Sequence, residues 1–107
     1  MPTYAVAHLR NVKIGPEITA YLECIDATLA PFDGQFLVHG GPVEMLEGER
    51  LGDVIIIAFP DQARARAWYS SAAYQAILPL RTNNSDGDVI LIDTVADDHR
   101  ATDILAL

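Results

Sequence analysis

The chain has 107 residues, half of them hydrophobic, and its formal net charge is -8 at pH 7. This length suits a single domain with a modest core, and the large apolar share predicts that some of the surface is buried in a homo-oligomer. The seven basic residues form no run, so we expect neither nucleic acid nor an anionic membrane surface as a partner.

The first half of the chain predicts a strand, a helix and a second strand. Residues 3–11 alternate between two faces in the way typical of a strand. A helix is expected to begin at Pro16, because proline suits the first helical turn and apolar residues then recur at helical spacing. Residues 35–39 predict the second strand, which Gly40-Gly41-Pro42 interrupts before an extended stretch over residues 43–46.

The second half of the chain predicts a central strand followed by a helical region. After a turn over residues 48–52, residues 53–59 are apolar on both faces, which is typical of a central strand covered on both sides. Asp61 is expected to cap a helix, and Ser70-Ser71 offers a second cap within the same region. Pro79 is expected to kink or end the regular hydrogen bonding there.

A loop over residues 83–87 and a last strand over residues 89–95 complete the order β-α-β-β-α-β. This order predicts an α+β fold of the ferredoxin-like type. Right-handed crossovers then place the antiparallel strands in the order 4-1-3-2. Both helices should cover one face of the sheet. We expect the other face, with Ile55 or Ile57 on it, to pack against a second copy of the chain.

One domain over residues 1–96 and a C-terminal tail over residues 97–107 are expected. The tail begins with charged side chains and ends with the apolar Ile104, Leu105 and Leu107. A tail left free in water gains nothing from these apolar side chains, so we expect it to dock on the protein's own dimer.

Two blocks of the sequence carry a resemblance. The first is FLVHGGPVEMLEG, residues 36–48, and the second comprises Ile57-Ala58-Phe59-Pro60, Ala67-Trp68-Tyr69-Ser70-Ser71, Tyr74 and Arg81. From about Tyr4 to Val95 the chain resembles the bacterial domain of unknown function 1330 family, a branch of the dimeric α/β-barrel superfamily. The resemblance implies a homodimer in which two ferredoxin-like sheets pack face to face as a dimeric α/β barrel.

The chain departs from the family pattern in two respects. The family usually has arginine at the position of His39, and residues 96–107 extend beyond the usual end.

The wider superfamily includes small, often cofactor-free enzymes that act on hydrophobic ring compounds, such as monooxygenases, lactone isomerases and polyketide cyclases. The resemblance implies chemistry of this type, although the fold alone does not choose among these reactions.

His39 is the first candidate for acid–base chemistry. A neutral imidazole can accept and return a proton near pH 7, which suits isomerisation, cyclisation or enolisation. Gly40 and Gly41 beside it would let a substrate approach the backbone closely. In the alternative interpretation His39 only ends a strand and the two glycines form a bulge.

His8 is the second candidate for proton transfer. We expect it near Asp86 and Asp88, where a carboxylate would hold one tautomer of the ring and raise its basicity. Alternatively, His8 is a satisfied polar residue at the edge of the sheet. His39 is expected toward the opposite end of the sheet from His8, and the third histidine, His99, lies in the tail. We therefore predict no three-histidine metal site.

Trp68, Tyr69 and Tyr74 form an aromatic group in the second helical region. Core packing is the plain interpretation of this group. Alternatively, the group is the wall of an apolar pocket in which a tyrosine hydroxyl orients a carbonyl group. Arg81 is expected either to neutralise a carboxylate or enolate in that pocket, or to pair with Asp86 at the surface.

Glu44 shares a face with an apolar neighbour, so we expect it to be half buried. Alternatively, Glu44 is solvated or bridges a dimer interface.

The single Cys24 excludes an internal disulfide and a cysteine-built zinc site, which fits a reducing cytoplasm. We expect no signal peptide, and no apolar run is long enough to span a bilayer.

Together these patterns predict a cytoplasmic homodimer that performs acid–base chemistry without a cofactor or metal on a small hydrophobic carbonyl or phenolic compound. The reaction would be of the isomerase, cyclase or monooxygenase type, with His39, His8 and Tyr69 handling protons. The expected ligand contacts are Tyr4, Gly40, Gly41, Glu44, Trp68, Tyr74 and Arg81. The alternative is a binding module, a sensor or carrier that holds such a compound without turnover. A histidine or glutamate within hydrogen-bond reach of a second polar group in an enclosed pocket favours the enzyme.

Overall fold

The computed structural model describes residues 1–49 and 52–106. Its strands and α-helices are β1 (Thr3–Arg10), α1 (Pro16–Leu29), β2 (Gln35–His39), β3 (Asp53–Phe59), α2 (Gln62–Ser70), α3 (Ala72–Thr82) and β4 (Asp86–Asp93). Two 3-10 helices, η1 (Ala30–Phe32) and η2 (Ala101–Ala106), follow α1 and end the described tail. The turn predicted over residues 48–52 lies partly, and Leu107 wholly, outside the described residues.

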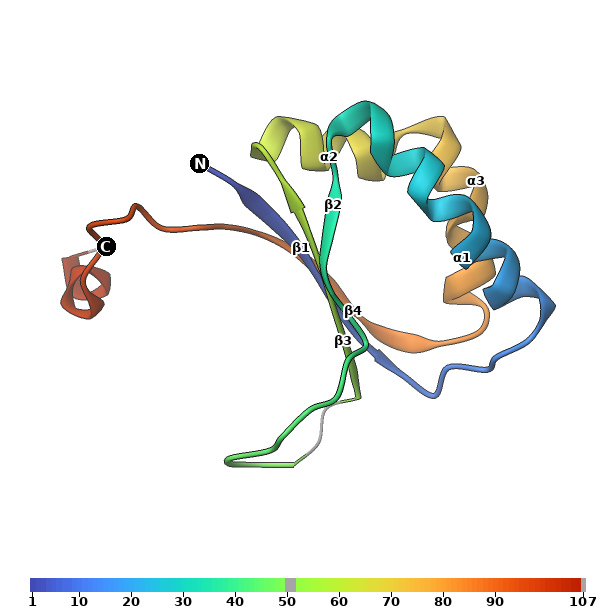
Figure 1. Cartoon of the computed structure of the whole chain (residues 1–107), viewed down its shortest axis with the longest axis horizontal. Coiled ribbons are helices and arrows are strands. Elements are labelled where there is room, and N and C mark those ends of the chain that lie inside the picture. Colours follow the sequence, from blue (N-terminus) through green and yellow to red (C-terminus); the bar gives the residue numbers. More distant parts are fainter. Residues whose placement is uncertain (50–51, 107) are drawn as a thin grey trace.

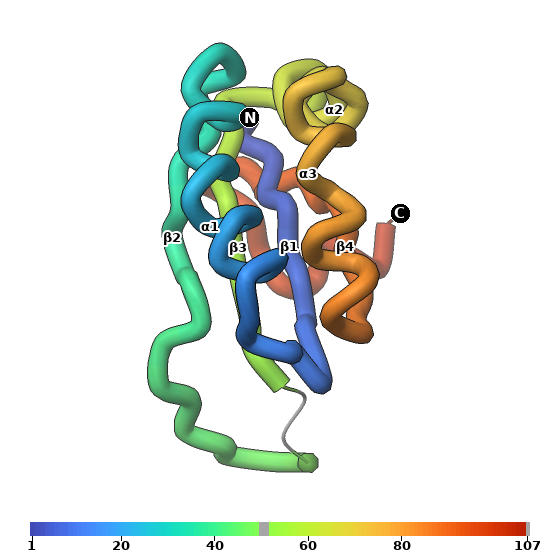
Figure 2. Tube along the Cα trace, turned by 90° about the vertical axis from the view of Figure 1, so that its right-hand side faces the viewer, coloured from blue at the N-terminus to red at the C-terminus, as the bar shows by residue number. Residues whose placement is uncertain are grey.

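The four strands form one antiparallel sheet in the order β2-β3-β1-β4, which confirms the predicted order read from its other end. In Figure 1 the helices α1, α2 and α3 all lie on one side of this sheet. Figure 2 shows α1 and α3 side by side in front of the strands. Among the described residues the sheet stays open, with β2 and β4 as its edges. The predicted ferredoxin-like α+β fold is confirmed.

The first helix forms where the sequence predicts it. Proline occupies its first turn, and its apolar residues recur every three or four positions, which gives one buried stripe. The buried hydrophobic side chains of this stripe are Ile18, Tyr21, Ile25 and Leu29. Gly34 then brings the chain close over the core, because a Cβ atom there would lie 2.8 Å from the ring of Phe59.

Both caps predicted for the second helical region are confirmed. The Asp61 carboxylate accepts a 2.8 Å hydrogen bond from the backbone N–H of Arg64 at the start of α2. The Ser71 hydroxyl accepts a 3.2 Å bond from the backbone N–H of Tyr74 and so starts α3. Each cap satisfies a backbone donor that the first helical turn cannot pair.

Pro79 does not end the helix, because it lies inside α3, which continues to Thr82. A proline removes one backbone donor but keeps its carbonyl acceptor. The Pro79 carbonyl accepts a 2.9 Å hydrogen bond from the backbone N–H of Asn83, so the helical pattern continues past it.

Two strand predictions need correction. The last strand begins at Asp86 and ends at Asp93, rather than covering residues 89–95, because β1 pairs with it as far as Arg10 opposite Asp86. Residues 43–46 pair with no strand among the described residues and form an exposed arm with the rest of residues 42–49. We call this segment the β2–β3 arm.

The core lies between the three α-helices and the sheet. Phe59 and Trp68 are both buried, and their ring centroids are 5.4 Å apart. The indole N–H of Trp68 donates a 3.0 Å hydrogen bond to the Thr28 hydroxyl, which itself donates to the carbonyl of Ile25. This chain of bonds satisfies the polar atoms that α1 and α2 bury together.

The sheet face opposite the helices is apolar and open. Cross-strand partners share a face, so Val6 of β1 lies between Ile56 of β3 and Ile90 of β4 on this side. Ile90 is 52 % exposed. The expectation that Ile55 or Ile57 would lie here is wrong. Both lie on the helix side of the sheet, where Ile55 lines a cavity and Ile57 belongs to the hydrophobic core.

The tail is tied to the body at its root and then departs from it. The backbone N–H and the hydroxyl of Thr94 both donate 3.0 Å hydrogen bonds to the carbonyl of Pro2. Beyond this point η2 lies apart from the sheet in Figure 1, with Ile104 and Leu105 exposed. Among the described residues no helix is long and apolar enough to cross a membrane.

Candidate functional site

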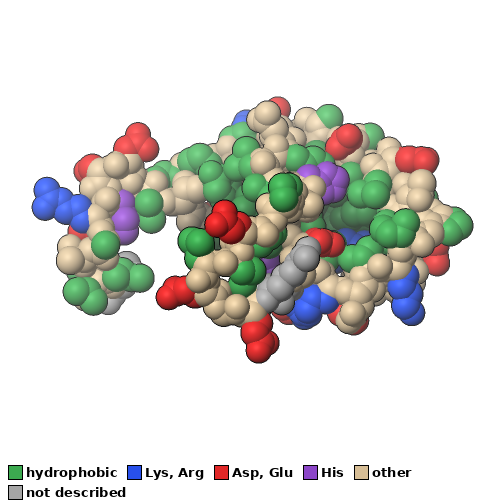
Figure 3. All heavy atoms as spheres, turned by 60° about the horizontal axis from the view of Figure 1, so that its bottom comes forward, with side chains coloured by type: hydrophobic (Ala, Val, Ile, Leu, Met, Phe, Trp, Pro, Cys, Tyr) green, Lys and Arg blue, Asp and Glu red, His purple; other side chains and the backbone are tan. Residues whose placement is uncertain are grey.

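A cavity of about 250 Å³ lies between α1 and the concave face of the sheet. Its walls are mainly aliphatic and come from β1, α1 and β3, among them Leu9, Ile18, Leu22, Ile25 and Ile55. Figure 3 shows hydrophobic side chains gathered around a hollow in the surface, with a histidine beside it. This volume lies just below the usual range for small-molecule pockets, so the cavity suits a compact apolar ligand.

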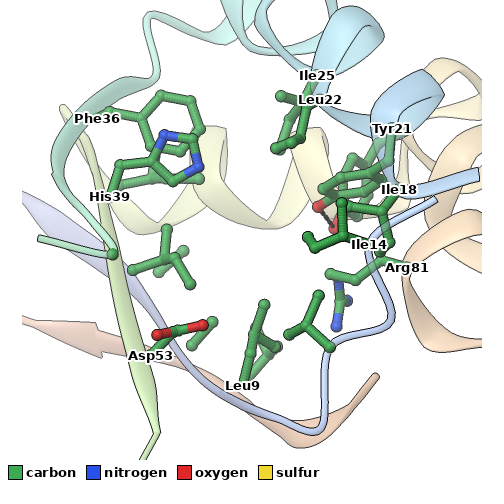
Figure 4. Close-up of a pocket in the computed structure, with 18 of the residues that line it drawn as sticks. Leu9, Ile14, Ile18, Tyr21, Leu22, Ile25, Phe36, His39, Asp53 and Arg81 are labelled. Atoms are coloured by element: carbon green, nitrogen blue, oxygen red, sulfur yellow. Dashed lines mark hydrogen bonds between the residues drawn. The ribbon is translucent and has the colours of Figure 1, made fainter. Parts of the chain in front are cut away.

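The imidazole of His39 lies at the exposed mouth of this cavity. It stacks on the ring of Phe36 (Figure 4), with ring centroids 4.5 Å apart and an angle of 15° between the planes. Asp53 at the start of β3 is exposed and lines the same mouth. Among the described residues no ion pair joins Asp53 to His39.

A bulge in β2 explains why these two rings share a face. Residues three apart in a regular strand point to opposite faces. Here Phe36 pairs with Ile57 and His39 pairs with Ile55, and Leu37 is the extra residue between them. The bulge therefore turns His39 to the helix side of the sheet. The bulge itself lies before Gly40 and Gly41, and not at these glycines as the alternative interpretation expected.

The inner end of the cavity carries a polar group formed by two helices. Tyr21 of α1 and Tyr74 of α3 have their hydroxyl oxygens 2.8 Å apart, and their rings meet edge to face. Arg81 follows Tyr74 by seven residues on α3, which places both on one face of the helix. The guanidinium carbon of Arg81 lies 5.9 Å from the centre of the Tyr21 ring.

Burial and mutual contact set the protonation of the Tyr21 and Arg81 side chains in this cluster. Burial raises the pKa of the Tyr21 phenol, and the neighbouring Tyr74 raises it further. Burial alone would lower the pKa of the Arg81 guanidinium, but the oxygens of Tyr74 and Tyr21 raise it above its usual value. At neutral pH Tyr21 is therefore a hydrogen-bond donor, and Arg81 carries a full positive charge.

Five of the predicted site residues line the cavity, namely His39, Gly40, Trp68, Tyr74 and Arg81. Tyr4 and His8 lie on the opposite, open face of the sheet, with His8 directly across from Asp88 as expected. Asp88 pairs instead with Arg10, at 3.4 Å. Arg81 forms no ion pair with Asp86, whose carboxylate accepts from the side chain of Asn11.

Three other predicted residues lie outside the cavity. Tyr69 is 37 % exposed and lies beside β4, although its ring is 5.6 Å from that of Tyr74. Gly41, directly before the β2–β3 arm, and Glu44 within it are both exposed, so the expected half-burial of Glu44 is wrong for the single chain. A Cβ atom added to Gly41 would meet nothing within 4 Å.

The expectation that His8 and His39 lie at opposite ends of the sheet is also wrong. His39 pairs with Ile55, which pairs on its other side with Ala7, so both histidines lie at the same end. β1 and β2 run in the same direction because each is antiparallel to β3. The two rings are separated by the sheet itself, since they lie on its opposite faces.

Two functional candidates were missed from the sequence, Tyr21 and Asp53. In the sequence Tyr21 stands out only as one of the regularly spaced residues that predict the apolar stripe of the first helix. A hydroxyl on a buried stripe requires a polar partner, and this was the signal that could have identified it. Asp53 carries no such signal, because its position at the mouth depends on how β3 pairs with β2.

The fold and the cavity define a ferredoxin-like α+β protein with a mainly apolar pocket between its helices and its sheet. The chain belongs to the domain of unknown function (DUF1330) family, whose model matches residues 2–95. A protein of unknown function from Rhodopseudomonas palustris is 18% identical, with 89% of this chain and 83% of that chain covered and a TM-score of 0.67.

A dimeric ferredoxin-like protein of unknown function from Jannaschia sp. CCS1 is also similar in structure. It is 18% identical, with 88% of this chain and 100% of that chain covered and a TM-score of 0.61. No curated protein matches the chain. At these identities the similar structures establish the shared fold.

Proposed function

We propose that this protein is a homodimer whose cavity receives a small, mainly hydrophobic carbonyl or phenolic compound and performs acid–base chemistry on it without a cofactor. The observation that carries the proposal is that the polar groups of this mainly apolar cavity lie at its two ends. A titratable imidazole lies at its mouth, and a hydrogen-bonding and cationic group lies at its inner end. A ligand bound between them would touch aliphatic walls and meet polar groups only at its two ends.

His39 is the proposed proton-transfer residue. It would remove a proton from the carbon next to a carbonyl group and return one to the same or another atom, so that no redox partner is required. Tyr21 is unsuited to act as a base, because its raised pKa keeps the phenol protonated near neutrality. The tyrosine pair and Arg81 would instead stabilise the negative charge that forms on the carbonyl oxygen.

The homodimer is supported by the open apolar face of the sheet around Val6, Ile56 and Ile90. An exposed patch of this kind on a small chain normally marks an interface. The similar protein from Jannaschia sp. CCS1 is described as dimeric and carries the same fold. A second copy packed on this face would leave the cavity on the helix side accessible.

The proposal is tested by following deuterium incorporation into small ketones, for example acetophenone, by NMR in D₂O. We expect the protein to accelerate exchange at the carbon next to the carbonyl. His39→Gln should lower this rate by about 10²-fold or more, the usual contribution of a general base. Tyr69→Phe, outside the cavity, is the matched control and should exchange at the wild-type rate. A His39→Gln protein with full activity would remove His39 from its proposed role.

A second candidate function, binding without turnover, is favoured by one specific observation. The ring of His39 is exposed and stacks on Phe36, whereas the close polar contact in the cavity joins Tyr21 to Tyr74. A general base is usually oriented by a second polar group. Ketone binding with no exchange above the buffer rate would support a sensor or carrier.

A further inference from the structure

Arg81 is a buried cation without a carboxylate partner in the described part of the chain. It is only 9 % exposed, and buried arginines are normally paired. The chain has 15 acidic and 7 basic residues, so carboxylates are plentiful. Arg10 and Arg64, both at the surface, each pair with an aspartate at 3.4 Å. The other described basic side chains that form no ion pair are exposed to water, whereas Arg81 is buried.

The surroundings of Arg81 add a hydrogen-bond donor. Two phenol hydroxyls hold two protons, and the bond between Tyr21 and Tyr74 uses only one of them. The second O–H remains able to donate to a ligand. A guanidinium beside a free O–H matches a carboxylate, whose two oxygens accept a pair of parallel N–H bonds and further donors.

The remainder of the cavity limits the ligand to a single negative charge. Aliphatic side chains from α1 and β1 form most of its wall, so the body of the ligand should be apolar. The mouth carries the carboxylate of Asp53, and the chain as a whole is strongly acidic. A second negative charge at the outer end of the ligand would be repelled there. This disfavours phosphates and dicarboxylates.

We infer that the cavity binds a small apolar monocarboxylate, with its carboxylate held by Arg81 at the inner end and its apolar body directed toward His39. The inference rests on the proposed function in taking the cavity as the ligand site. It specifies the class of ligand, because a carboxylate takes the place beside Arg81 that the proposed function gives to the carbonyl oxygen. The bound carboxylate supplies the counter-ion that Arg81 lacks.

Matched acids and amides of one shape test this inference. Benzoate and benzamide are titrated into the protein and followed through the fluorescence of Trp68, the single tryptophan, which lines the cavity. Benzoate should bind more tightly than benzamide. Arg81→Met should weaken benzoate binding by about 10- to 100-fold, as expected for lost charge-assisted hydrogen bonds, and should leave benzamide binding nearly unchanged. Arg66→Met removes the same charge from the surface and should have no effect.

Stability provides a second measurement on the same variants. Without ligand, Arg81→Met should melt at or below the wild-type temperature, because the oxygens of Tyr21 and Tyr74 stabilise the charge that the variant removes. Benzoate should raise the melting temperature of the wild type and not of the variant. If Arg81→Met does not fold, Arg81→Lys keeps the charge and loses the paired N–H geometry. It should then weaken benzoate binding more than benzamide binding.

Two outcomes separate the inference from the proposed function. Equal affinities for benzoate and benzamide, or an affinity for benzoate that the Arg81 variants leave unchanged, would overturn the inference. Ketone exchange dependent on His39 would still support the proposed function in that case. If no probe binds and no ketone exchanges, both fail.

Discussion

The ring of His39 lies 4.5 Å from the ring of Phe36, nearly parallel to it, although the two residues are three apart in one strand. This relationship exists because Leu37 is an extra residue in β2 and shifts the following side chains by one position. The proton-transfer residue proposed here thus reaches the cavity through a strand irregularity. The aromatic ring beside it limits the orientations that the imidazole can adopt.

Deleting Leu37 should restore regular pairing and turn His39 out of the cavity. Phe36 packs against the core, whereas the β2–β3 arm that follows His39 is exposed and freer to shift. We expect the fold to persist and the upfield NMR shift of the His39 ring protons, caused by the Phe36 ring, to disappear. Phe36→Leu is the control that removes the ring without moving the strand. A retained shift in the deletion variant would contradict the bulge.

Gly40 should tolerate a β-branched residue less well than its neighbour. Its φ angle is 66°, in the left-handed region that side chains other than glycine rarely adopt. Gly40→Val should therefore cost roughly 1 kcal/mol or more of stability, measured by urea unfolding. Gly41→Val is the matched control, because a Cβ atom there would meet nothing within 4 Å. Equal losses in the two variants would show that backbone strain at Gly40 is unimportant.

A charge in the centre of the open sheet face should split the proposed dimer. Ile56 lies on this face opposite Val6, so Ile56→Asp would place a carboxylate in an interface that buries on the order of 1,500 Å² in total. Light scattering should give a dimer mass for the wild type and a monomer mass, or unfolding, for the variant. Ala27→Asp on the exposed side of α1 should stay dimeric. A monomeric wild type at micromolar concentration would contradict the dimer.

The tail should contribute to stability through its apolar end. Ile104 is 62 % and Leu105 83 % exposed in the single chain, and docking on a partner would cover them. Deleting residues 97–107 should lower the melting temperature, and Ile104→Ser with Leu105→Ser should reproduce most of the loss. An unchanged melting curve, together with fast amide exchange in the intact tail, would show instead that the tail does not dock.

Stability should fall at alkaline pH in a way that depends on Tyr21. Burial raises the pKa of this phenol, so the folded chain holds the proton more tightly than the unfolded chain does. This contribution is complete below the ordinary pKa near 10 and is lost as the pH rises above it. Tyr21→Phe should therefore show a shallower loss of melting temperature between pH 9 and 11. Parallel curves for the two proteins would contradict the raised pKa.

Much of the fold was determined by local features of the sequence. The apolar stripe of α1, the caps at Asp61 and Ser71, and the doubly apolar run over residues 53–59 each depend only on near neighbours. Such features specify element type and order, and right-handed crossovers then leave one strand order. The sequence predicted the ends of elements less well where strand pairing sets them, as at the start of β4.

The candidate site was decided by the tertiary structure. Leu37 has no composition signal that marks it as a bulge, yet it sets the face on which His39 lies. The sequence left Arg81 open between a pocket and a surface pair with Asp86, and it is a buried cation because α3 packs against α1 at Tyr21. Strand register and helix packing depend on residues far apart in the chain. The contacts that bury Arg81 and aim His39 therefore form only when these segments come together.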